Sequence, residues 1–235
     1  MTYFIWAFIF THLTVLSVSV YLHRTLAHNA LVLNVYLATM IRLYLWLGTG
    51  LVSTTWVAVH RKHHRYTDEE QDPHSPKHKG LLNVLFGGTF MYLREGKDAI
   101  AMQAYGRRCP RDWLELSLFQ KYPYLGLPIW LAFLCFTFGY MGILLFIVNF
   151  LWIPIIGGGV VNGIGHSWGY RNSNTADHSA NFFPLGVLMA GEELHNNHHA
   201  SPGSAKFSIK WFEFDIGWAW IRVLSLLGLA HVRTS

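Results

Sequence analysis

YPYLGLPIWLAFLCFTFGYMGILLFIVNFLWIPIIGGGVVNGIG, residues 122–165, contains no Asp, Glu, Lys or Arg. An apolar segment of about 20 residues is long enough to cross a bilayer core of roughly 30 Å, and this stretch has twice that length. Gly139, Tyr140, Met141 and Gly142 lie near its middle and provide residues for a tight reversal. The stretch therefore predicts a hairpin of two membrane-spanning helices.

Other apolar segments surround this hairpin in the sequence. Residues 3–22 carry no charged side chain apart from His12, and they predict a further span. Residues 31–53 contain Arg42 and residues 211–230 contain three charged side chains, so we expect interfacial helices there. With 52% hydrophobic and 13% charged residues, the chain predicts one all-α integral membrane domain over residues 1–235. We expect about three transmembrane helices.

Basic residues are concentrated in one loop. Eleven of the eighteen Lys and Arg lie in residues 61–121, between the first span and the hairpin, and such loops stay in the cytoplasm. Attraction to anionic lipid or to an acidic electron donor is a secondary interpretation, and nucleic acid is not an expected partner. Cys109 and Cys135 are the only cysteines, which is too few for an iron–sulfur or rubredoxin-type site. Any electrons that the chain uses would therefore have to come from a separate protein.

Histidines are the second unusual feature, because eight of the fourteen fall in three tight groups. The groups are His23 and His28; His60, His63 and His64; and His195, His198 and His199. Residues at i, i+3 and i+4 share one face of an α-helix, so each triplet can direct its imidazoles to one point. Imidazole suits iron, copper, nickel and zinc, and two sets of about four nitrogens exceed what one zinc ion binds. The groups therefore predict two metal ions.

The first pair has a different spacing. His23 and His28 are five residues apart, which is about 140° out of phase on a regular helix. If both bind metal, the first span should end or unwind there. His12 and His231 are isolated and are expected to be ordinary interfacial or surface residues.

Four further histidines lie near the groups or the hairpin. For His74, His78 and His178 we expect surface positions or contacts to ligands rather than metal binding. His166 directly follows the hairpin, and Asn162 lies four residues earlier on the same helical face. An ionisable group at the end of a span is a functional candidate, but the spacing alone leaves metal binding and an ordinary interfacial role equally open.

All three groups must lie on one side of the membrane to share a site. This holds if residues 3–22 cross once, residues 31–53 do not cross, and the hairpin crosses twice. The N-terminus is then outside, and the interfacial segments carry a histidine-ligated di-metal site on the cytoplasmic side.

The chain resembles the membrane fatty-acid desaturases, especially the bacterial acyl-lipid and acyl-CoA type. Three segments carry the resemblance: residues 23–28 (HRTLAH), residues 56–74 with HRKHH and Asp72-Pro73-His74, and residues 191–199 (GEELHNNHH). The resemblance extends over nearly the whole chain. The animal acyl-CoA desaturases have four spans, whereas we expect three here.

The resemblance implies two irons, cycling between Fe2+ and Fe3+, with nine histidine ligands. The ligands would be His23, His28, His60, His63, His64, His166, His195, His198 and His199. Asn162 would hold a water close to one iron. Carboxylates beside the groups are candidates to accept a hydrogen bond from a ligand imidazole, and the sequence does not choose among them. These are Asp68, Asp72, Asp177, Glu192 and Glu193, of which Asp72, Asp177 and Glu192 join Asn162 in the predicted site.

The activity implied is oxygen-dependent desaturation of a long acyl chain, with O2 as the co-substrate. The acyl chain would be carried by CoA, acyl carrier protein or a membrane lipid, and electrons would come from a ferredoxin, a rubredoxin or a cytochrome b5-type protein. The expected location is the bacterial inner membrane. Hydroxylation or decarboxylation by the same site is an alternative, and the spacing of His23 and His28 modestly favours desaturation over hydroxylation. A non-enzymatic metal-binding or transport protein is another, but residues 122–165 offer few polar groups to line a path.

Overall fold

The computed structural model describes residues 2–233, and most of these residues are helical. Helix α1 (Thr2–Leu16) continues without a break into the π-helix η1 (Ser17–Ala27). Together they form one apolar helix of 26 residues, long enough to cross a membrane. The N-terminal half is largely exposed, whereas η1 is buried, so the helix enters the interior of the molecule at its C-terminal end.

The predicted hairpin turn is present, but only one of its two arms is long enough to span a membrane. Its second arm runs continuously over Met141–Ile164 and comprises α8 (Met141–Trp152), the π-helix η3 (Ile153–Val161) and α9 (Asn162–Ile164). Its first arm, α7 (Gly126–Phe138), has 13 residues and is about 20 Å long, shorter than a bilayer core. The chain before Gly126 forms turns instead of extending this helix.

Helices α2 (Val35–Thr49) and α3 (Ser53–Arg65) meet at an angle of 88°. Gly50, with a φ of +70°, ends α2 in the left-handed conformation that glycine adopts without strain. By length and composition, the described residues contain two helices able to span a membrane, or three if this bent pair is one span. Arg42 in α2 is buried, and its guanidinium forms ion pairs with Asp112 and Glu115.

Shorter elements complete the fold. These are α4 (Pro76–Lys79), α5 (Leu81–Glu95), α6 (Ala99–Tyr105), η2 (Glu115–Phe119), α10 (His195–Ala200) and α11 (Ile216–Leu226). Strand β1 (Leu31–Leu33) pairs antiparallel with β4 (Ala230–Val232), and β2 (Leu185–Gly186) pairs parallel with β3 (Phe214–Asp215). The expected interfacial helix at residues 211–230 is thus a strand followed by α11, whose first turn is capped by the side chain of Asp215.

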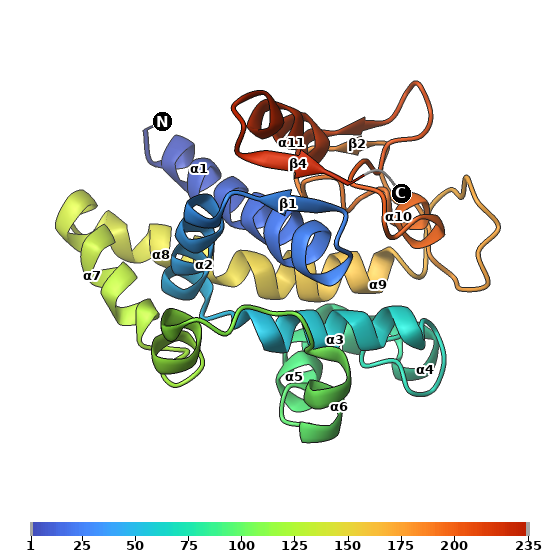
Figure 1. Ribbon diagram of the computed structural model, residues 1–235, viewed down its shortest axis with the longest axis horizontal. Coiled ribbons are helices and arrows are strands. Elements are labelled where there is room, and N and C mark those ends of the chain that lie inside the picture. The colour runs from blue at the N-terminus through green and yellow to red at the C-terminus, as the bar shows by residue number, and fades with distance from the viewer. Residues whose placement is uncertain (1, 234–235) are drawn as a thin grey trace.

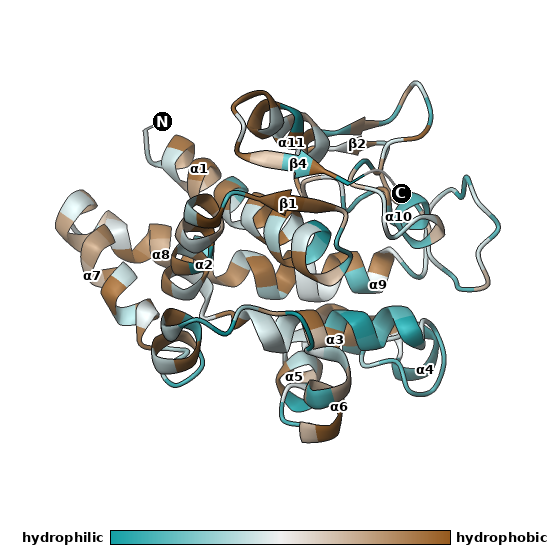
Figure 2. Ribbon diagram, in the orientation of Figure 1, coloured by the Kyte–Doolittle hydropathy of each residue, from teal (hydrophilic) through white to brown (hydrophobic). Residues whose placement is uncertain are grey.

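The apolar and polar parts of the molecule lie at opposite ends. The start of α1 and the turn between α7 and α8 are at one end, and α4 and α10 are at the other (Figure 1). Apolar residues dominate the first end, and polar residues gather along α3 and α4 toward the second (Figure 2). The main core joins η1, β1, α2 and α11 through Tyr21, Leu31, Leu45 and Ile221. This core holds η1 beside the segments that carry the other histidines.

Candidate metal centre

Nine histidines meet in two groups at the polar end of the fold. The first group is His23, His28, His60, His64 and His198, and the second is His63, His166, His195 and His199. Within each group, one ring nitrogen from every residue lies within 4.8 Å of all the others. These are the nine predicted ligands, and the structure brings all of them together.

The two spatial groups do not coincide with the groups in the sequence. Helix α3 directs His60 and His64 to the first group and His63 to the second. Helix α10 divides in the same way, since His198 belongs to the first group and His195 to the second. Each triplet therefore contributes to both groups, and α3 and α10 together tie the two groups into one centre.

The π-helix η1 explains the five-residue spacing of the first pair. The backbone N–H of His28 donates to the carbonyl oxygen of His23 at 3.0 Å, an i to i+5 hydrogen bond typical of a π-helix. The hydroxyl of Thr25 likewise donates to the carbonyl of Val20 at 2.8 Å. A five-residue spacing predicts that a regular helix ends or unwinds at this point. The structure agrees with this prediction: the helix is unwound to the π form over Ser17–Ala27 and ends at Ala27, with His28 as its C-cap residue.

Distances between ring nitrogens test whether the groups fit metal ions. In the first group, the Nε2 atoms of His28 and His60 are 2.8 Å apart, and the Nε2 atoms of His23 and His64 lie 3.0 and 2.9 Å from that of His198. In the second group, the Nε2 atoms of His166 and His195 are 2.9 Å apart. Two imidazoles that bind one metal at about 2.1 Å and at a right angle have nitrogens about 3.0 Å apart. The donor set therefore fits two metal ions of the kind that prefers imidazole.

Unpartnered nitrogens point to the same fit. His63 and His199 are each hydrogen-bonded through Nδ1, and their buried Nε2 atoms have no partner among residues 2–233. A buried imidazole nitrogen without a partner loses the hydrogen bond that it makes in water, which costs about 1–3 kcal/mol. A bound metal would remove this cost at both atoms.

Carboxylates accept from the outer nitrogens of four of the histidines. Glu192 lies 2.7 Å from Nδ1 of His23, Asp72 lies 3.0 Å from Nδ1 of His63, Asp177 lies 3.1 Å from Nδ1 of His199, and Asp68 lies 3.0 Å from Nδ1 of His166. Such contacts fix the ring orientation and leave Nε2 as the ligand atom. Glu193, the remaining candidate, contacts none of the nine rings and accepts from the backbone N–H groups of Met189 and Gly191.

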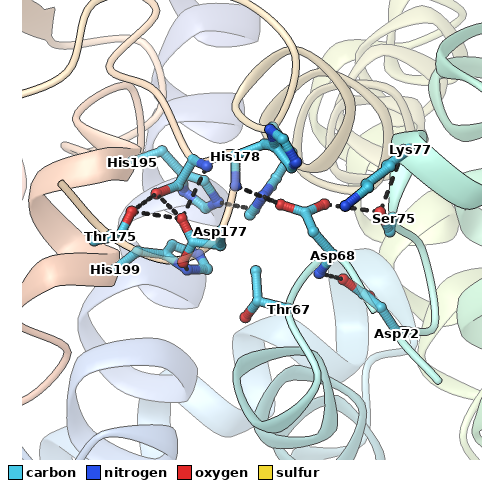
Figure 3. Close-up of polar contacts among 12 residues, drawn as sticks. Thr67, Asp68, Asp72, Ser75, Lys77, Thr175, Asp177, His178, His195 and His199 are labelled. Atoms are coloured by element: carbon cyan, nitrogen blue, oxygen red, sulfur yellow. Dashed lines mark hydrogen bonds and ion pairs between the residues drawn. The ribbon is translucent and has the colours of Figure 1, made fainter. Parts of the chain in front are cut away.

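Asp68 connects three segments that are distant in the sequence. Besides His166, its carboxylate accepts from the backbone N–H of His178 at 2.8 Å and from the hydroxyl of Ser75 at 2.7 Å (Figure 3). Burial alone would raise the pKa of Asp68, but these hydrogen bonds and the neighbouring imidazole outweigh it and hold the pKa well below its usual range. The carboxylate is therefore ionised at neutral pH and available to orient His166.

The imidazoles of α10 are kept in the form that binds metal. Burial, with the neighbouring imidazoles, lowers the pKa of His195, His198 and His199 well below the usual value for histidine. These rings are therefore neutral at pH 7, and a metal does not have to displace a proton from them.

The remaining histidines lie outside the two groups. His12 stacks on Phe8 in α1, and His231 is exposed in β4. The backbone N–H of the buried His74 donates to Asp72 at 3.0 Å, and its ring lies 4.5 Å from that of His63. Nε2 of His78 lies 3.0 Å from the carbonyl oxygen of Asp68. These three contacts support the loop that carries Asp68 and Asp72.

A cavity of about 600 Å3 opens beside the histidines. His23, His60, His195 and Asn162 line one part of it. From there the cavity runs along α5 and η3 to the break between α2 and α3. Its lining along this path includes Gly88, Tyr92, Phe150, Ile153 and Tyr124. An apolar cavity next to polar groups is the usual form of a small-molecule site.

Arg24 is a structural residue that spacing arguments did not identify. Its guanidinium is fully buried, pairs with both carboxylate oxygens of Asp215 at 3.0 and 3.1 Å, and donates to the hydroxyl of Ser19. That hydroxyl donates to Glu192, which in turn contacts His23. A charged residue at the end of an apolar helix is the signal that could have identified it.

Comparison with known proteins gives a consistent family relationship. The family model described as fatty acid desaturase matches residues 1–232. The Delta-9 acyl-lipid desaturase 2 of Arabidopsis thaliana is 31% identical over 241 residues, which cover 97% of this chain and 75% of that protein. The Delta-9 desaturase-like 4 protein of the same plant is 32% identical, with 93% and 72% covered. The Acyl-CoA C20 Delta5-desaturase of Anemone leveillei is 33% identical, with 88% and 66% covered.

Proposed function

We propose that this chain, which belongs to the fatty acid desaturase family and desaturates fatty acids, uses two histidine-bound irons and dioxygen for that reaction. The product would be a long acyl chain with a new double bond. The observation that carries this proposal is the meeting of nine imidazoles in two adjacent groups with nitrogens about 3 Å apart. Imidazole donors without cysteine suit iron and disfavour magnesium or calcium.

The proposed ligands are the five histidines of the first group for one iron and the four of the second group for the other. Asn162 lines the cavity beside the second group and is proposed to hold a water near its iron. When bound, the iron pair with dioxygen and electrons supplies the oxidising power that removes two hydrogens from adjacent methylene carbons, a reaction that no side chain can perform.

The chain itself orients the ligands and positions the substrate. Glu192, Asp72, Asp177 and Asp68 hold their imidazoles in the orientation that presents Nε2. The cavity beside His23 and His195 is proposed to hold the acyl chain in a fixed path and to keep bulk water away from it. The carbon that is oxidised is then decided by how far the chain extends past the histidines.

The substrate class follows from the relatives. One relative is named for acyl lipids and another for acyl-CoA, so we propose a fatty acyl group on a lipid or on CoA, with acyl carrier protein as a further carrier. A separate ferredoxin, rubredoxin or cytochrome b5-type protein is proposed to deliver electrons. The two or three apolar helices fit a multi-pass membrane protein, and we propose the cytoplasmic face of a bacterial inner membrane as the position of the irons.

Product analysis tests the proposed reaction against its alternatives. An expressing host is fed a deuterated saturated fatty acid, and its lipids are analysed by gas chromatography and mass spectrometry. We expect an unsaturated acyl chain of unchanged carbon number, absent with His198→Ala and retained with His231→Ala, which alters a histidine outside both groups. A hydroxylated acid, or a terminal alkene one carbon shorter, would replace desaturation by hydroxylation or decarboxylation.

A further inference from the structure

A second cavity, of about 760 Å3, lies where β1 and the start of α2 face the loop after α6. Among the described residues, no side chain lines both this cavity and the one beside the histidines. The proposed desaturation does not use this cavity, so its lining needs an explanation of its own.

The lining is strongly basic. Five arginines contribute to it: Arg42, Arg61, Arg107, Arg108 and Arg233. Asp112 is the one acidic residue among the described lining residues, and Arg42 already pairs with it at 2.6 Å. The cavity therefore has a large excess of positive charge, which attracts an anion.

Arg61 fixes the loop that carries two of these arginines. Its guanidinium donates to the backbone carbonyls of Leu26 and Ala27 on one side and to those of Tyr105 and Arg107 on the other, at 2.6 to 3.0 Å. Arg108 has a φ of +62°, which is costly for a residue with a side chain. The loop is thus held in an unfavourable conformation close to η1, as is common at binding sites.

The guanidinium groups of Arg107 and Arg108 are exposed, and neither forms an ion pair with an acidic side chain of residues 2–233. Each can therefore donate two parallel hydrogen bonds to a phosphate. Beside them, the wall of the cavity is apolar, with Leu33, Val35 and Ala38 among its residues. Unpaired arginines next to an apolar wall match a ligand that has both a phosphate and a hydrocarbon part.

We propose that this cavity binds an anionic phospholipid of the surrounding bilayer, with Arg107 and Arg108 on its phosphate and the wall formed by β1 and α2 against its acyl chains. Basic pockets at the cytoplasmic ends of membrane helices bind such headgroups. A phosphate of CoA has the same chemistry, but the two cavities share no lining residue, so we propose the lipid as the ligand here and use CoA as the competitor in the test.

Native mass spectrometry of the full chain, purified in a zwitterionic detergent, tests this proposal. Samples are equilibrated with phosphatidylglycerol, with phosphatidylcholine or with free CoA, and the retained molecules are counted. We expect one tightly held phosphatidylglycerol per chain and at least about tenfold weaker retention of phosphatidylcholine. The double variant Arg107→Gln/Arg108→Gln should lose most of the phosphatidylglycerol.

The control double variant Lys77→Gln/Arg94→Gln removes the same charge from exposed positions that line neither cavity. It should retain the lipid as the unaltered protein does. Equal retention of both lipids by the unaltered protein would overturn the proposal even if the Arg107→Gln/Arg108→Gln variant did not fold. Displacement of phosphatidylglycerol by equimolar CoA would overturn it in favour of a carrier site.

Discussion

Four carboxylates orient four of the nine imidazoles of this centre, and Asp68 forms contacts with three distant segments. It accepts from His166, His178 and Ser75, and its backbone has a φ of +59°. Asparagine adopts this conformation readily, so Asp68→Asn keeps the loop and removes only the charge. The sequence could not single out Asp68 among the candidate carboxylates. Asp68 lies in a loop whose path depends on contacts with residues about a hundred positions away.

We predict that Asp68→Asn weakens metal affinity by about 10- to 100-fold, because a neutral amide oxygen is a weaker acceptor for the Nδ1–H of His166 than the carboxylate that now orients the ring. Competition with a chelator, followed by iron analysis of the protein, measures this change. Glu70→Gln is the matched control, since Glu70 is an exposed carboxylate of the same loop. Equal iron retention by the two variants would show that Asp68 does not orient a ligand.

At the scale of elements, the close contact between α5 and η3 positions the arm that leads to His166. A Cβ on Gly88 would lie only 2.2 Å from the carbonyl oxygen of Gly158, so glycine is required for this approach. Gly87, on the same helix, has room, since its Cβ would lie 3.9 Å from the side chain of Met91.

We predict that Gly88→Ala forces the two helices apart and destabilises the protein by about 1–3 kcal/mol, as overpacking does. The apparent Tm of detergent-purified protein should fall, whereas Gly87→Ala should leave it nearly unchanged. An unaltered Tm in Gly88→Ala would mean that the contact does not support the fold.

Helical spacing was sufficient to predict that the two triplets meet, because α3 and α10 are regular helices. It also predicted that the first span ends or unwinds between His23 and His28, but it could not predict a π-helix, because the form of η1 depends on packing against α2, α3 and α11. The sequence also could not predict that each triplet divides between two groups, because this depends on how α3 and α10 face each other.

At the scale of the whole molecule, α10, which carries three of the histidines, and the hairpin turn lie at opposite ends (Figure 1). Tyr140 in that turn is exposed, as is Arg94 at the end of α5. If the basic loop is cytoplasmic, these two positions face opposite sides of the membrane.

Cysteine labelling of intact cells tests this topology. In a Cys109→Ser/Cys135→Ser background, we predict that a membrane-impermeant maleimide labels Tyr140→Cys in intact cells and Arg94→Cys only after permeabilisation. Labelling of Arg94→Cys in intact cells would place the metal centre on the outer side.

The measurement that tests the central claim most directly is the ratio of iron to protein in the purified chain. We predict about two irons per chain, because each imidazole group supplies enough nitrogens for one metal ion. The ratio should fall in His63→Ala and stay at the unaltered value in His231→Ala. Active protein that holds one iron per chain, or none, would contradict the di-iron centre.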